Sequence, residues 1–66
     1  MRVQVIHEDS NGAKTDIGLF ELDHMPPVGE PFRVDNGTCF ASKAYFGPDE
    51  TGMYLLVLEG EPRLLD

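Results

Sequence analysis

Apolar and polar residues alternate along most of this chain, in short stretches separated by Gly, Pro and Asn. Alternation with a period of two places successive side chains on opposite faces of an extended strand, whereas a helix repeats every 3.6 residues. The pattern therefore predicts an all-β fold of five short strands. Their ranges are about 2–8, 14–22, 32–35, 38–46 and 53–59.

Two Asn-Gly pairs, at residues 11–12 and 36–37, mark connections between successive strands. Asn-Gly is the strongest short signal for a type I′ hairpin turn, because both residues tolerate a positive φ. Within the second strand the apolar residues change face beside Gly18. A change of face at a glycine predicts a β-bulge or a sharp bend at this position.

The fifth strand is apolar on both faces, which predicts that it occupies the most buried position in the sheet. Pro62 is expected to end its pairing and to leave residues 60–66 as a tail or a single helical turn. The predicted core consists of Val3, Val5, Ile17, Leu19, Phe32, Val34, Phe40, Leu55 and Val57.

Residues 23–31 contain three prolines, which exclude a helix interior and a central strand. We interpret this segment as an ordered surface loop. Five antiparallel strands in so short a chain favour a small closed or nearly closed barrel, because closure removes exposed strand edges. The whole chain, residues 1–66, is then one domain.

Residues 26–30 read Pro-Pro-Val-Gly-Glu, and a short strand, a hairpin and a longer aromatic strand follow. This Pro-x-x-Gly-acidic turn and its strands resemble SH3-like small barrels over residues 26–59, and are similar to small bacterial and phage proteins of that shape. The resemblance implies a five-stranded antiparallel SH3-like barrel and carries no functional residue with it. The chain has no tryptophan, which argues against recognition of proline-rich motifs.

Twelve acidic and five basic side chains give a formal charge of −7. Phosphate backbones and anionic lipids are bound by Lys and Arg, so this balance argues against direct nucleic-acid binding and against membrane docking. Apolar residues make up 41% of the chain, which favours a folded core over disorder.

Cys39 is the single cysteine, so the chain cannot form an internal disulfide. A lone thiol is ordinary in a reducing compartment, and Met1 is not followed by the apolar segment of a signal peptide. The longest apolar run, residues 53–58, is far short of the roughly 20 residues that span a bilayer. These features predict a soluble, cytoplasmic protein in which Cys39 is a small buried hydrophobe.

No catalytic, cofactor or metal site is predicted. His7, His24 and Cys39 lack the spacing of a zinc site, and a nucleophilic cysteine needs a neighbouring base. Asp49 and Glu50 lack the ligand pattern of a calcium loop. The aromatic side chains are interpreted as core phenylalanines with tyrosine hydroxyls at the rim, the alternative being a platform for stacked bases. They are Phe40, Tyr45, Phe46 and Tyr54.

These observations predict a non-enzymatic protein–protein interaction module with an acidic surface. A sharper version is an inhibitor that mimics nucleic-acid charge and binds a partner with a basic groove. The alternative is a structural homo-oligomeric subunit with no ligand of its own. Acidic pairs at strand ends are expected to share a rim and bind the partner. They are Glu8, Asp9, Glu21, Asp23, Glu59 and Glu61.

Overall fold

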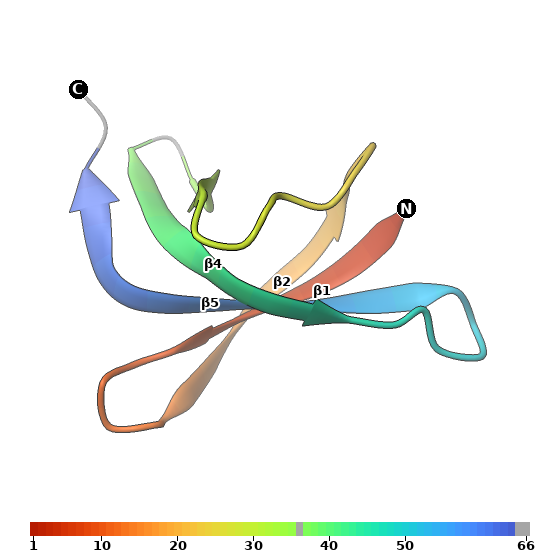
Figure 1. The fold of residues 1–66 in the computed structure, drawn as a ribbon, viewed down its shortest axis with the longest axis horizontal. Coiled ribbons are helices and arrows are strands. Elements are labelled where there is room, and N and C mark those ends of the chain that lie inside the picture. Colours follow the sequence, from red (N-terminus) through yellow and green to blue (C-terminus); the bar gives the residue numbers. More distant parts are fainter. Residues whose placement is uncertain (36, 65–66) are drawn as a thin grey trace.

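All five predicted strands are present in the computed structural model, which describes residues 1–35 and 37–64 (Figure 1). Over these residues no helix is long and apolar enough to cross a membrane. The second, third and fifth strands differ in their ends from the predicted ranges. The strands are β1 (Arg2–Glu8), β2 (Lys14–Glu21), β3 (Pro31–Arg33), β4 (Thr38–Phe46) and β5 (Met53–Leu64).

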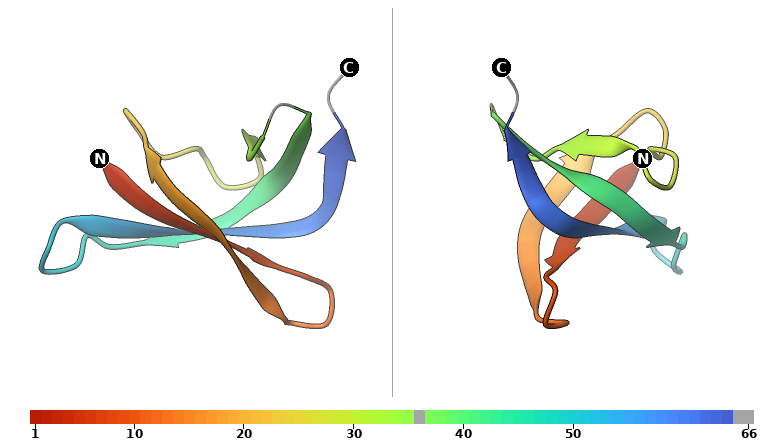
Figure 2. Two further views of the ribbon diagram at one scale, coloured as in Figure 1. Left: turned by 180° about the vertical axis from the view of Figure 1, so that it is seen from behind. Right: turned by 60° about the vertical axis from the view of Figure 1, so that its left-hand side comes forward.

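The strands form one open, mixed sheet in the order β2-β1-β5-β4-β3. The β1–β2, β3–β4 and β4–β5 pairs are antiparallel, whereas β1 and β5 run parallel. The predicted all-antiparallel closed barrel is therefore wrong. Alternation and turns specify each strand and hairpin locally, but not that the last strand inserts beside the first in the same direction. The sheet is strongly twisted, so that β1 and β2 cross the direction of β4 and β5 (Figure 2).

The central position predicted for the fifth strand is confirmed, because β5 lies between β1 and β4. Pairing does not end at Pro62, however, and β5 continues to Leu64. Between the Cys39–Arg63 and Ala41–Glu59 pairs the register shifts, so Pro62 lies in an irregular stretch. Proline is tolerated there because no regular ladder requires its missing N–H. Residues 65–66 of the predicted tail lie outside the described residues.

The bulge predicted beside Gly18 is confirmed. Val5 pairs with Gly18 and Ile6 pairs with Asp16, which leaves Ile17 as the extra residue of β2. Its insertion changes the face on which the following side chains lie. Leu19 consequently lies on the opposite face from the core, with 58% of its surface exposed, and the prediction that Leu19 is a core residue is wrong.

Residues 9–13 and 49–53 form two turns of the same kind. In each, the N–H of the first residue donates to the carbonyl of the fifth, and the N–H of the fourth donates to the carbonyl of the first. The fourth residues, Gly12 and Gly52, have φ values of 85° and 84°. Asn11 has no positive φ, so the predicted type I′ turn is wrong and a three-residue loop takes its place. The second predicted turn contains Asn36, which lies outside the described residues.

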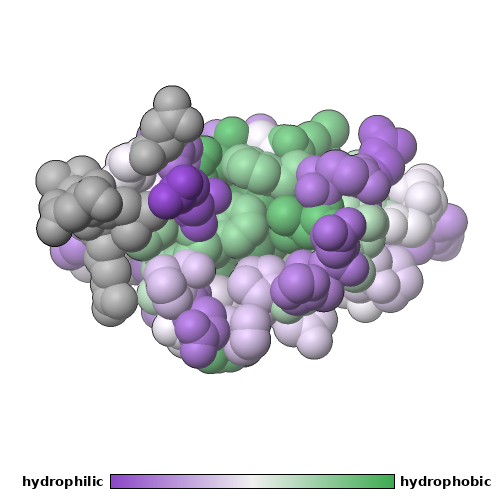
Figure 3. Space-filling view, turned by 90° about the horizontal axis from the view of Figure 1, so that it is seen from above, coloured by the Kyte–Doolittle hydropathy of each residue, from purple (hydrophilic) through white to green (hydrophobic). Residues whose placement is uncertain are grey.

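The core lies on one face of the sheet, here called the covered face, over which the loop before β3 passes (Figure 1). Four fully buried side chains form its centre, among the described residues: Val3, Val5, Leu56 and Leu58. Two residues of β5 were predicted for the core. Val57 is buried, with 7% of its surface exposed, whereas Leu55 is only half-buried, and both lie on the other face of the sheet. Seen from above this face, apolar residues gather along the middle and hydrophilic residues border them (Figure 3).

Candidate functional site

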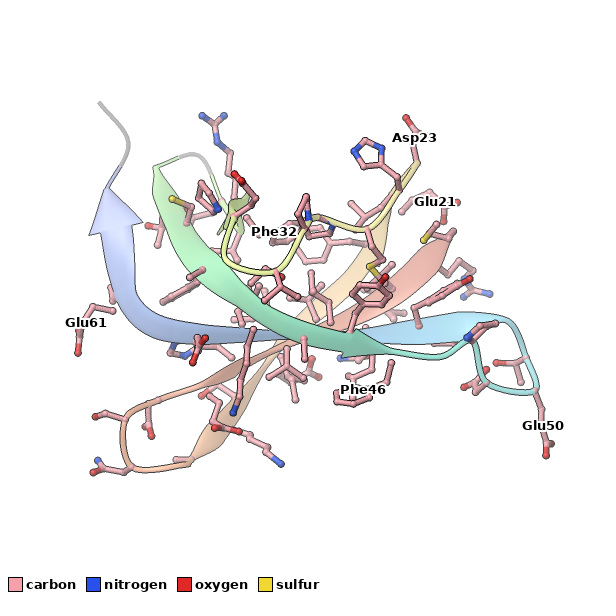
Figure 4. The ribbon with its side chains drawn as sticks, viewed as in Figure 1. Glu21, Asp23, Phe32, Phe46, Glu50 and Glu61 are labelled. Atoms are coloured by element: carbon pink, nitrogen blue, oxygen red, sulfur yellow. The ribbon has the colours of Figure 1, made fainter. Side chains whose placement is uncertain are left out.

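The face of the sheet opposite the core carries a second set of apolar side chains. Leu19, Gln4, Leu55 and Phe46 follow one another as register partners across β2, β1, β5 and β4. Phe32, on the covered face, and Phe46 lie on opposite sides of the sheet (Figure 4). We call this second surface the open face. Its residues are Gln4, Ile6, Leu19, Ala44, Phe46, Leu55 and Val57.

Large apolar side chains on the open face are exposed to an unusual degree. Phe46 and Leu19 each expose 58% of their surface, on β4 and β2. Two adjoining hollows, of about 430 and 200 Å³, share Phe46 and Leu55 in their linings. A sheet face that meets water is normally polar, and contiguous exposed apolar surface marks an interaction site. The prediction that Phe46 packs in the core is wrong.

Charged side chains of both signs border the open face. Lys43 donates a hydrogen bond of 2.8 Å to Glu8 Oε1. This hydrogen bond and the attraction between the two charges lower the pKa of the Glu8 carboxyl and raise the pKa of the Lys43 ammonium. Lys14 lines the smaller hollow with this pair, and Gln4 donates a hydrogen bond to Asp16.

Four of the six acidic residues predicted to bind a partner lie together. Glu8, the last residue of β1, is the register partner of Glu59, which lies within the parallel strand β5. Asp9 and Glu61 line the same hollow of about 380 Å³ with them. The predicted pairs Glu8–Asp9 and Glu59–Glu61 therefore lie side by side through the parallel pairing of β1 and β5, and not at the rim of a barrel.

The other two predicted residues, Glu21 and Asp23, lie away from this group. They line a separate hollow of about 350 Å³ with His24 and Phe32. Glu61 and the Glu21–Asp23 pair lie toward opposite ends of the molecule (Figure 4). Glu21 Oε1 lies 3.4 Å from the amino-terminal ammonium group. The six acidic residues therefore do not form one continuous surface.

Several acidic side chains hold turns. Asp9 Oδ1 accepts hydrogen bonds from the N–H groups of Asn11 and Ala13, and Asp49 does the same for Thr51 and Met53. The Thr51 hydroxyl and these N–H groups lower the pKa of the Asp49 carboxyl. Sequence reasoning missed this role. The signal was the pattern Asp-x-x-Gly, which occurs in both turns.

A third aspartate holds the connection between β3 and β4. Asp35 Oδ1 accepts hydrogen bonds from the N–H groups of Gly37 and Thr38. The Gly37 N–H contributes most to lowering the pKa of the Asp35 carboxyl. Part of the negative charge of this chain therefore has a structural role in its turns.

The histidines and the cysteine do not converge. The centroids of the His7 and Phe40 rings lie 4.1 Å apart, and His7 Nε2 forms a 2.8 Å hydrogen bond with the Gly60 carbonyl. Cys39 is buried, as predicted, with 3% of its surface exposed. Residues 1–35 and 37–64 contain no group of three or more side chains placed to hold a metal ion.

Comparison with known proteins gave no match to a protein-family model, to a curated protein or to a solved structure. The resemblance to SH3-like domains therefore stays a prediction. The candidate site rests on the open face and its charged border.

Proposed function

We propose that this chain is a non-enzymatic protein-interaction module whose partner packs against the open face. The observation that carries this function is the row formed by Leu19, Gln4, Leu55 and Phe46, with two large side chains exposed at 58%. Burying such apolar surface is favourable by about 25 cal/mol per Å². A partner that covers the row therefore gains this free energy on binding.

The extent of the open face favours a protein over a small molecule as the partner. Its apolar residues come from four adjacent strands, and charged residues such as Glu8, Lys14 and Lys43 border them. An apolar centre inside a polar rim is the usual composition of a protein–protein interface.

The acidic hollow supports a second form of the same function. Glu8, Asp9, Glu59 and Glu61 line it together, and a partner with a basic groove would be steered toward it. The inhibitor that mimics nucleic-acid charge belongs to this second form. Two of these four carboxylates already have partners within the chain, because Glu8 is paired with Lys43 and Asp9 holds its turn. We therefore favour the open face as the main surface.

An affinity experiment with three variants tests the proposed function. A tagged and an untagged copy of the chain are co-expressed, so that retention of the untagged copy reports self-association. The tagged chain is then mixed with a lysate of its source cells, and mass spectrometry identifies the proteins that it retains. At least one protein retained by the wild type should be absent from the proteins retained by the Phe46→Ser variant. Val28→Ser is the matched control, because Val28 is also exposed (65%) but lies on the loop before β3. Glu59→Gln/Glu61→Gln tests the acidic hollow.

Retention of the same proteins by the wild type and Phe46→Ser would contradict an interaction through the open face. If only the Glu59→Gln/Glu61→Gln variant fails to retain a protein that the wild type retains, the interaction belongs to the acidic hollow instead.

A further inference from the structure

We propose that the open face binds a second copy of this chain, so that the protein is a homodimer with a two-fold axis through this surface. This inference rests on the proposed function and names its partner. In such a dimer the same patch is used by both subunits, and each contact occurs twice. Phe46 of each copy then packs into the hollows of the other, which Phe46 and Leu55 line.

The small core gives the chain a physical reason to dimerise. Among the described residues only Val3, Val5, Leu56 and Leu58 form the fully buried apolar cluster. Small natural domains often add disulfides, a metal or a partner chain to the stability of their core. The single cysteine excludes a disulfide within the chain, and the open face provides apolar surface for association.

The charge pattern at the open face fits a second copy. Each chain carries a formal charge of −7, so two copies repel one another wherever acidic residues dominate. The border of the open face carries Lys14 and Lys43 together with Glu8 and Asp16. A two-fold axis can place the lysines of each copy near the acids of the other, which offsets part of the repulsion between the two acidic chains at this border, while the apolar row supplies the binding.

The outline of the molecule on the side of the open face is large enough for a dimer interface. Figure 1 looks down the shortest axis of the molecule, and Phe46 lies below the sheet in the same view (Figure 4). On that side the outline of the whole chain measures 35 by 19 Å, or roughly 650 Å². Each partner in a standard interface buries about 600–1,000 Å², so the interface needs the charged border as well as the apolar row.

Sedimentation equilibrium tests this dimer directly, because the mass should rise from 7.3 kDa toward twice that value with concentration. Phe46→Glu should weaken the dimer by about 30-fold or more, as loss of an aromatic hot-spot residue does. Val28→Glu adds the same charge on the loop before β3 and should leave the dimer intact. Circular dichroism checks that each variant is folded.

Leu19→Glu gives an independent variant from β2, and it decides the outcome if Phe46→Glu fails to fold. Raising the salt concentration from about 0.05 to 0.5 M should strengthen the dimer, because screening reduces repulsion between two acidic chains. Weakening by salt would mean that ion pairs hold the copies together, and it would overturn an apolar interface.

A wild-type chain that stays monomeric at all concentrations overturns the dimer. So does a dimer that Phe46→Glu and Leu19→Glu leave unchanged, or one that Val28→Glu alone abolishes. If the wild type is monomeric while another protein is retained only when Phe46 is intact, the proposed function stands and the second copy is the wrong partner. If neither dimer formation nor the retention of another protein depends on Phe46, both the proposed function and the dimer are wrong.

Discussion

Replacing Leu56 by alanine should remove a large part of the stability of this chain, whereas the same change at the adjacent Leu55 should cost much less. Leu56 is fully buried in the core cluster, and Leu55 is half-buried on the open face. The pair is a matched comparison, because both leucines lie in β5 and both become alanine.

The expected magnitudes follow from burial. Removing a fully buried leucine side chain typically costs about 2–5 kcal/mol, from lost transfer free energy and the cavity left behind. We expect about 3 kcal/mol for Leu56→Ala. A chain of 66 residues has a total stability of about 3–10 kcal/mol. Leu55 keeps contact with solvent and leaves no closed cavity, so Leu55→Ala should cost about 1 kcal/mol.

Urea unfolding followed by circular dichroism measures both values. With a slope of about 1 kcal/mol per molar urea, Leu56→Ala should lower the midpoint by about 3 M and Leu55→Ala by about 1 M. Measurements at a protein concentration at which sedimentation shows only monomer keep dimer formation from adding to the stability. Equal losses for the two variants, or a larger loss for Leu55→Ala, would refute the assignment of the two faces of β5.

Ser42→Ala should raise the free energy of unfolding by about 1 kcal/mol, because the fully buried Ser42 hydroxyl has no hydrogen-bond partner among the described residues; a lower urea midpoint would contradict this. Gly52→Ala should cost about 1 kcal/mol in thermal unfolding, because its φ of 84° is one that alanine rarely adopts; an unchanged melting temperature would count against the turn geometry. The depressed pKa of Asp49 stabilises the fold above the ordinary value of 3.8, and this contribution is lost as the pH falls through the lower pKa of the folded state. The stability difference between the wild type and Asp49→Asn, from urea midpoints at neutral and acid pH, should therefore narrow below about pH 4, and a difference that widens there would be inconsistent with this role.

Local features of this chain could be predicted from its sequence because their causes are local. A period of two identifies strands, and the change of face beside Gly18 identified the bulge that the register of β1 and β2 confirms. The Asp-x-x-Gly pattern at residues 9–12 and 49–52 also specifies its turn locally, through hydrogen bonds from nearby N–H groups to the aspartate.

The candidate site could be predicted only in part. Acidic residues at strand ends were expected at rims, and Glu8 and Glu59 do meet, because β1 and β5 are parallel neighbours. Phe46 and Leu55 were predicted to lie in the core, but they lie on the open face. The sequence does not distinguish an apolar residue that faces the core from one that faces the open side.

The sequence by itself determined the five strands, the bulge, the burial of β5 and the acidic charge of the chain. The tertiary structure alone decided the strand order, the parallel pairing of β1 with β5, and which face of β5 carries the core. The physical reason is the separation along the sequence between the residues that interact. Alternation, turns and bulges depend on residues a few positions apart, whereas strand order depends on contacts between segments tens of residues apart. In β5 both faces are apolar, so local pattern cannot distinguish the buried Leu56 from the half-buried Leu55; only the neighbouring strands and the loop that covers one face do so.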